Sequence, residues 1–98
     1  MEIVCEKAAR YVETLLPPFS PILERLEKEG QEEGIPYLLP CSAQFIRVLL
    51  GRLRPRRILE IGTAIGYSAI HMAEAAPEAH IVTLEIDAQL PGGANEQI

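Results

Sequence analysis

The sequence predicts an α/β protein in which N-terminal helices precede one strand–helix–strand unit of a parallel sheet. Three observations lead to this fold class. Apolar residues recur at helical spacing over the first half of the chain, two short runs rich in β-branched residues follow, and a glycine-containing turn comes directly after the first run. A strand, a turn, a helix and a second strand within about 30 residues make a βαβ unit, which is right-handed.

Residues 1–56 form the predicted N-terminal helical segment. Its first helix ends before the pair Pro17 and Pro18, because a proline ring supplies no helical N–H. The apolar stripe of this helix is made by Val4, Ala8, Tyr11 and Leu15. The second helix begins at Pro21, with Ser20 as its N-cap, and ends at a glycine, either Gly30 or Gly34.

An extended loop, residues 35–40, separates the second helix from the third, since two prolines bound it. The third helix is predicted over residues 42–53. Its apolar side contains Phe45, Val48 and Leu49, and Arg47 is expected on the outside.

Residues 57–87 form the predicted βαβ unit. The first strand covers 57–61 and stops at Gly62, a helix runs from Gly66 to Ala76 and stops at Pro77, and the second strand covers 80–86. Residues 88–98 read as an irregular tail, because Pro91 and two glycines stand where the next helix is expected. The sheet is therefore incomplete, and we interpret the chain as the front part of a longer domain, truncated or altered near residue 88, in preference to a complete miniature domain.

Composition excludes several classes of protein. The 98 residues are 48% hydrophobic and carry a net charge of −5, which argues against disorder and against a generally basic nucleic-acid binder. No apolar run approaches the roughly 18 residues of a membrane span. The first residues lack a secretory signal, and two cysteines are too few for a disulfide framework, so a cytoplasmic location is expected.

The run from Glu60 to Ser68 carries the candidate site. Its spacing is G-x-x-x-G, which differs from the dinucleotide fingerprint and from the P-loop. Glycines between a strand and a helix let the backbone approach a ligand, and the first N–H groups of the helix favour an electron-rich partner. Glu85, at the end of the second strand, is placed to accept hydrogen bonds from ribose hydroxyls. Glu60 is placed to bind a cationic amine or to hold the N–H groups of the turn.

Each of these features also has an ordinary structural interpretation. A single G-x-x-x-G turn often serves only close packing, and an acid at a strand end is usually solvated. Their order and spacing within one βαβ unit favour the binding of a nucleoside-type cofactor.

Two stretches carry a family resemblance: RILEIGTAIGYSAI over residues 57–70 and VTLEID over residues 82–87. They resemble class I S-adenosylmethionine (SAM)-dependent methyltransferases with a Rossmann-like sheet. More narrowly, they resemble the metal-dependent O-methyltransferases, the catechol and caffeoyl-CoA group, and within it the bacterial branch that methylates tRNA 5-hydroxyuridine. The similarity covers about residues 8–87.

The resemblance implies a set of cofactor contacts in this chain. Glu85 would hold the ribose, and Leu38 would touch the methionine end of SAM. The remaining contacts would come from Glu60, Gly62, Ala64, Gly66 and Ser68. The family's metal-binding acids, which hold a divalent ion such as Mg²⁺, lie beyond the second strand. The catalytic residues are therefore expected beyond the end of this chain, and no metal ligand is assigned within it.

The resemblance also implies the reaction and its partners. The full domain would transfer a methyl group to tRNA 5-hydroxyuridine or, alternatively, to a small catechol-like or acyl-CoA phenol, and a homodimer is expected. Arg52, Arg54, Arg56 and Arg57 are either a solvated basic turn or a contact for RNA phosphates. A third alternative is an inactive fragment that only self-associates.

Overall fold

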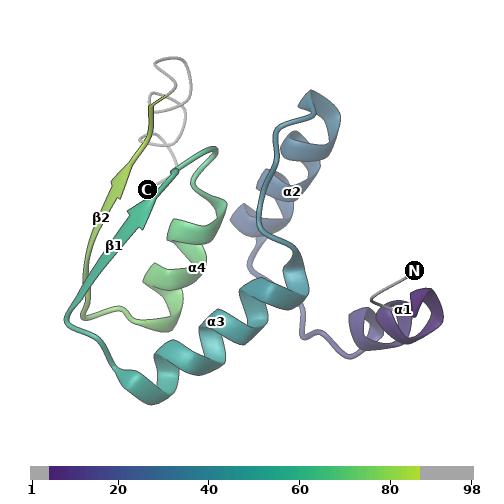
Figure 1. The fold of residues 1–98 in the computed structure, drawn as a ribbon, viewed down its shortest axis with the longest axis horizontal. Helices are drawn as coiled ribbons and strands as arrows, with labels where there is room; N and C mark the ends of the chain where they lie inside the picture. The colour runs from purple at the N-terminus through teal and green to yellow at the C-terminus, as the bar shows by residue number, and fades with distance from the viewer. Residues whose placement is uncertain (1–4, 87–98) are drawn as a thin grey trace.

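The computed structural model describes residues 5–86 of the chain, and Figure 1 shows how their helices and strands are arranged. The elements follow one another as α1 (Glu6–Thr14), α2 (Pro21–Glu33), α3 (Pro40–Leu53), β1 (Arg57–Ile61), α4 (Tyr67–Ala75) and β2 (His80–Leu84). This is the predicted order of helices and strands. The predicted irregular tail and the start of the first apolar stripe, at Val4, lie outside the described residues.

The two strands pair in parallel, with Arg57 opposite His80 and Ile61 opposite Leu84. Helix α4 connects them and packs beside them (Figure 1). β2 ends two residues earlier than predicted. The side chains that alternate toward the other face of the sheet are 43–76% exposed; they are Leu59, Ile61, Val82 and Leu84. Both strands therefore carry apolar side chains on both faces of the sheet, but the described residues cover only one of these faces.

Helix α2 begins and ends where backbone chemistry requires it. Pro21 is its first residue, and the chain leaves the helix through Gly34 at φ +68°, a left-handed conformation that favours glycine. Gly34, rather than Gly30, is therefore the C-terminal cap. Ser20 occupies the N-cap position but does not cap the helix with its side chain. Its hydroxyl instead donates to a carboxylate oxygen of Glu74, 2.7 Å away.

Helix α3 departs from the prediction in its start and in its orientation. It begins at Pro40, two residues earlier, because proline fits the first position of a helix. Phe45 and Val48, predicted on the apolar side, are 68% and 63% exposed, as is much of Leu49. Arg47, predicted outside, points toward α4. The prediction was wrong because α3 is apolar on more than one side, so its periodicity could not select the packed face.

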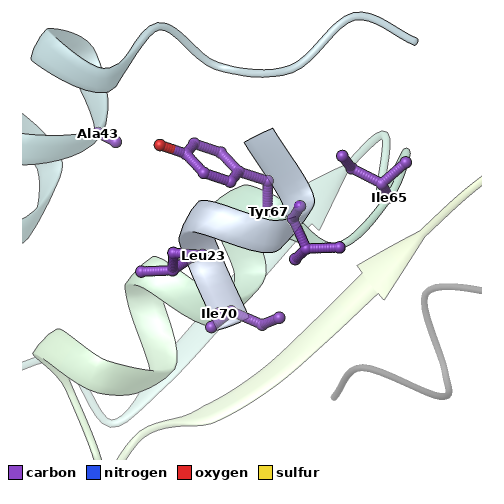
Figure 2. Packing of buried hydrophobic residues seen from close by; sticks show 6 residues of the cluster. Leu23, Ala43, Ile65, Tyr67 and Ile70 are labelled. Carbon is purple, nitrogen blue, oxygen red and sulfur yellow. The ribbon is translucent and has the colours of Figure 1, made fainter. Parts of the chain in front are cut away.

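The core lies where α2, α3 and α4 meet (Figure 2). Its buried side chains are Leu23, Leu26, Ala43, Ile65, Tyr67 and Ile70. Tyr67 donates a hydrogen bond from its phenol oxygen to Oε1 of Glu27 at 2.5 Å and thereby ties α4 to α2. Within the described residues, no helix is long and apolar enough to cross a lipid bilayer.

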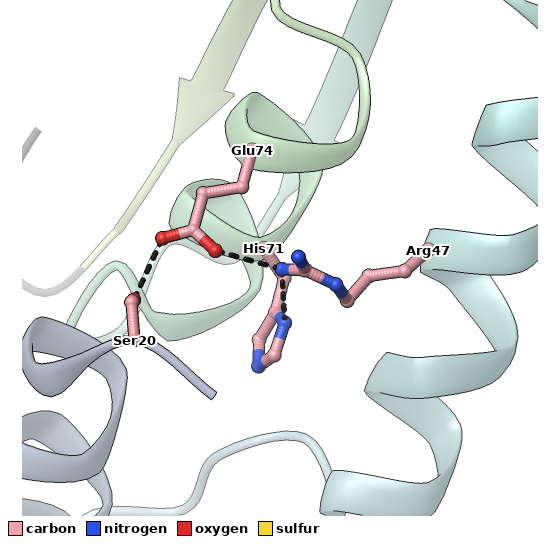
Figure 3. A network of polar contacts seen from close by, with 4 residues as sticks. All are labelled: Ser20, Arg47, His71 and Glu74. Carbon is pink, nitrogen blue, oxygen red and sulfur yellow. Dashed lines mark hydrogen bonds and ion pairs between the residues drawn. The ribbon is translucent and has the colours of Figure 1, made fainter. Parts of the chain in front are cut away.

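A polar network joins the same three elements (Figure 3). Nη1 of Arg47 lies 2.9 Å from Oε1 of Glu74 and 3.2 Å from Nδ1 of His71. Because arginine only donates, Nδ1 accepts and the imidazole is neutral. Burial, together with the positive charge of Arg47, lowers the pKa of His71 to about 4, against the opposing effect of Glu74. Burial raises the pKa of Glu74, but hydrogen bonds from Ser20 and Arg47 lower it by more.

Truncating a core leucine tests this packing. Leu23→Ala removes a fully buried side chain, and such truncations cost about 2–5 kcal/mol of unfolding free energy, because a cavity remains. The matched control Leu53→Ala changes a side chain that is 65% exposed and should cost less than about 1 kcal/mol. Urea unfolding followed by circular dichroism measures both. Equal losses for the two variants would contradict the assignment of the core.

The polar network predicts how stability depends on pH. The folded chain keeps His71 neutral, whereas the unfolded chain protonates it near its usual pKa of 6.5. The unfolded state therefore binds more protons between pH 6.5 and about 4, and the free energy of unfolding falls as the pH is lowered through that window. Below pH 4.5, protonation of Glu74 removes further stability.

Urea midpoints measured between pH 4 and pH 7 test this dependence. The variant His71→Gln should flatten the slope above pH 4.5, whereas His80→Gln, at an exposed position, should leave it unchanged. If His71→Gln retained the full slope, another group would be responsible for it.

Candidate functional site

A cavity of about 430 Å³ lies at the carboxyl end of β1, where the chain turns into α4. Its walls come from five parts of the chain: the loop before α3, Ile46 in α3, the end of β1, the turn over residues 62–66, and α4. Ligands of open α/β sheets bind outside the carboxyl ends of the strands, so the cavity lies where such a fold places its ligand.

The turn between β1 and α4 uses left-handed backbone at alternate positions. Gly62 has φ +96°, Ala64 φ +47° and Gly66 φ +85°. A Cβ added to Gly62 would meet no atom within 4 Å, so glycine is required here by the backbone and not by crowding. Gly66 is the N-cap residue of α4 and makes no side-chain cap, so the first N–H groups of the helix lack intrahelical acceptors.

The end of β2 holds this turn in place. The N–H groups of Gly62 and Thr63 both donate to the carbonyl oxygen of Leu84, at 2.6 and 3.1 Å. The N–H of Ala64 donates to Oε1 of Glu85 at 2.8 Å. Ala64 is a non-glycine residue in the left-handed region, which costs about 1 kcal/mol or more, and this charge-assisted hydrogen bond offsets that cost.

Glu60 is the centre of a hydroxyl network beneath the cavity. One of its carboxylate oxygens accepts a short hydrogen bond from Oγ of Ser68, and the other accepts from Oγ1 of Thr83 at 2.7 Å. Thr83 also lies 2.6 Å from the hydroxyl of Thr63. Since a carboxylate has about four acceptor sites, Glu60 is oriented by these hydroxyls and keeps capacity for a cationic ligand group.

The structure brings together the residues predicted from the sequence. Five of the seven predicted cofactor contacts line the cavity: Leu38, Glu60, Gly62, Ala64 and Ser68. Gly66 is buried behind them as the cap of α4, and Glu85 reaches the turn through Ala64. The seven residues therefore gather around one turn.

Thr83 and Tyr37 were not predicted as parts of the site. Thr83 pairs directly with Glu60 in the sheet register, so two aligned parallel strands would have identified it. Tyr37 lines the cavity, packs edge-on to Tyr67 with ring centres 5.1 Å apart, and accepts a hydrogen bond from Gln31 at 3.0 Å. The family resemblance placed Leu38 of the same loop at the cofactor, but no sequence pattern singled out Tyr37 beside it.

Tyr67 packs inside the wall of the cavity, and its environment keeps it protonated. Burial raises the pKa of the phenol well above its usual value, and its hydrogen bond to Glu27 raises it further. A phenol with such a raised pKa does not serve as a base near neutral pH. In the described part of the chain, no three His, Cys, Asp or Glu side chains come together as possible metal ligands.

Comparison with known proteins extends these observations. The model of a family described as O-methyltransferase matches residues 18–96. The chain is 31% identical over 98 residues to a catechol O-methyltransferase of Niastella koreensis, a match that covers 97% of this chain and 44% of the relative. The chain thus spans less than half the length of that protein.

Solved structures of O-methyltransferases share the fold of this chain. An O-methyltransferase from Bacillus cereus in complex with SAH superposes with a TM-score of 0.80 at 29% identity, over 94% of this chain and 43% of the other. The O-methyltransferase TomG from Streptomyces achromogenes, in complex with SAM, gives 0.78 at 28% identity, over 93% and 42%. The predicted methyltransferase fold is therefore confirmed, and the chain belongs to the O-methyltransferase family.

Proposed function

We propose that this chain forms the donor-binding part of a SAM-dependent O-methyltransferase. The observation that carries the proposal is the cavity at the carboxyl end of β1, with Glu60 held beneath it and a left-handed glycine turn at its edge. Relatives in complex with SAM and SAH superpose on this part of the chain, which supports the same ligand here.

The residues around the turn match the parts of such a ligand. Glu60 would accept the ammonium group of the methionine end, because its orientation is fixed by two hydroxyls. Glu85 would accept hydrogen bonds from the ribose hydroxyls while it still holds the turn. Leu38 and Tyr37 would cover the methionine side chain from the loop before α3.

SAM supplies an electrophilic methyl group, and the chain contributes by positioning it. A methyl transfer between two bound molecules gains rate when donor and acceptor are aligned, and the rigid turn fixes the donor. The resemblance also implies a divalent ion such as Mg²⁺ that lowers the pKa of the acceptor hydroxyl. The described residues do not assemble ligands for it, so we assign it no residue and no step in this chain.

For the acceptor, we propose the hydroxyl of a tRNA 5-hydroxyuridine. The four arginines at residues 52–57 support this choice, because their guanidinium groups suit phosphates. A small phenol is the rival acceptor, and a catechol O-methyltransferase among the relatives supports it. We further propose that the protein acts as a homodimer in the cytoplasm.

Calorimetric titration of the chain with SAH tests the donor site. We expect saturable binding that Gly62→Ala abolishes, because alanine does not readily adopt φ +96° and its methyl group would point into open space at the cavity. Glu60→Gln should weaken binding about tenfold or more, since a hydrogen bond to a charged group is lost. Circular dichroism and urea unfolding verify that both variants fold.

Gly51→Ala is the matched control for the added methyl group. Gly51 lies in α3, where a Cβ also meets no atom within 4 Å and the backbone is helical, so SAH binding should be unchanged. A folded chain that forms dimers but never binds SAH would contradict the donor-site proposal and support the self-associating fragment.

Transfer of a labelled methyl group tests the acceptor. With radiolabelled SAM and a full-length protein that contains this segment, we expect label in tRNA taken from cells that lack the 5-hydroxyuridine methylation, and no label in catechol. Label in catechol alone would favour the small phenol, and label in neither would contradict the acceptor proposal while leaving the SAH titration unaffected.

A further inference from the structure

Four arginines form a basic edge at the end of the sheet opposite the cofactor cavity. We call Arg52, Arg54, Arg56 and Arg57 the arginine edge; all four are exposed. Arg52 lies in the last turn of α3, Arg54 is its C-cap at φ +49°, and Arg57 begins β1. Figure 1 shows this edge where α3 and α4 end and the two strands begin.

The arginine edge has no acidic partner within residues 5–86, whereas three other arginines each form an ion pair. Arg10 pairs with Glu6, Arg25 with Glu29 and Arg47 with Glu74. The rest of the chain holds five basic and fourteen acidic residues, a net charge of −9. Acidic side chains are therefore abundant, yet none of those described pairs with this edge.

The negative charge close to the arginine edge is too small to neutralise its four arginines. The carboxyl ends of α3 and α4 both lie here, and each contributes about half a negative charge. Glu78 adds one more where it lines a cavity of about 550 Å³ together with Arg54 and Arg56. Against four positive charges this leaves an excess of about two, which favours an external anion.

We propose that the arginine edge binds the phosphate backbone of RNA. All four cations are arginine, whose planar fork suits bidentate contacts to phosphate oxygens, and they lie within six residues between the last turn of α3 and the start of β1. Among residues 5–86, no aromatic side chain lines the cavity beside them, which favours contacts to phosphates over stacking on bases. The negative charge of the remaining chain repels RNA elsewhere and confines it to this edge.

The position of the edge gives this contact a distinct role. β1 has five residues, so its two ends are about 13 Å apart, with the arginines at one end and the cofactor cavity at the other. RNA bound along the edge would thus be anchored away from the methyl donor, and a neighbouring nucleotide would reach the cavity. The inference rests on the proposed function only for the identity of this RNA as the acceptor.

Fluorescence anisotropy with a labelled RNA hairpin tests the inference. Four phosphate contacts predict a slope of about −3.6 for log Kobs against log salt, or about a 150-fold loss of affinity between 50 and 200 mM salt. Arg54→Gln combined with Arg56→Gln should halve that slope to about −1.8. Both side chains are exposed, so folding should be unaffected.

The matched control is Arg10→Gln combined with Arg25→Gln, which changes the net charge equally but alters paired arginines on α1 and α2. Equal slopes for both double variants would overturn the inference, as would displacement of RNA by an equal charge of polyglutamate or of anionic lipid vesicles. Titration of the unaltered chain with SAH and with the RNA hairpin separates the two proposals. In the unaltered chain, SAH binding without RNA binding overturns only this inference, and RNA binding without SAH binding overturns only the donor site. The Arg54/Arg56 double variant should keep its SAH affinity.

Discussion

The hydrogen bonds between the turn over residues 62–66 and the end of β2 hold the rest of the site together. The turn places three residues in left-handed backbone, and no regular element supports such a conformation by itself. The carbonyl oxygen of Leu84 and the carboxylate of Glu85 accept the N–H groups that the turn presents. The shape of the cavity therefore depends on the pairing of β2 with β1, although the paired residues of the two strands are 23 apart in sequence.

The N-terminal helices complete the cavity instead of forming a separate unit. Tyr67 is the link, because it starts α4 at the turn, bonds to Glu27 of α2 and packs against Tyr37 in the loop before α3. A Cβ at Gly30 would lie 2.7 Å from the ring of Tyr37, so this close approach of loop and helix requires glycine. Substitutions in α2 can therefore alter the wall of the cavity, through Tyr67 and Tyr37, without contacting a bound ligand.

Local chemistry explains which parts of the structure could be predicted. The first strand, the start of α2 at Pro21 and the glycine turn depend on neighbouring residues, and they lie where the sequence predicts them. The orientation of α3 depends on which apolar side finds a partner, and here Arg47 turned inward to meet Glu74 while Phe45 stayed exposed. Thr83 contributes to the site only through the register that sets it opposite Glu60, which composition and spacing do not reveal.

The two ends of β1 differ in charge, as the donor site and the RNA contact that we propose would require. At the carboxyl end, carboxylates of Glu60 and Glu85 surround a cavity suited to a cationic donor. At the amino end, arginines meet the carboxyl termini of two helices. A short parallel strand keeps these opposite charges about 13 Å apart, which limits their neutralisation of one another at a Debye length of about 8–10 Å. In our proposals, one strand can therefore separate a site for a cationic donor from a site for the phosphates of an acceptor RNA.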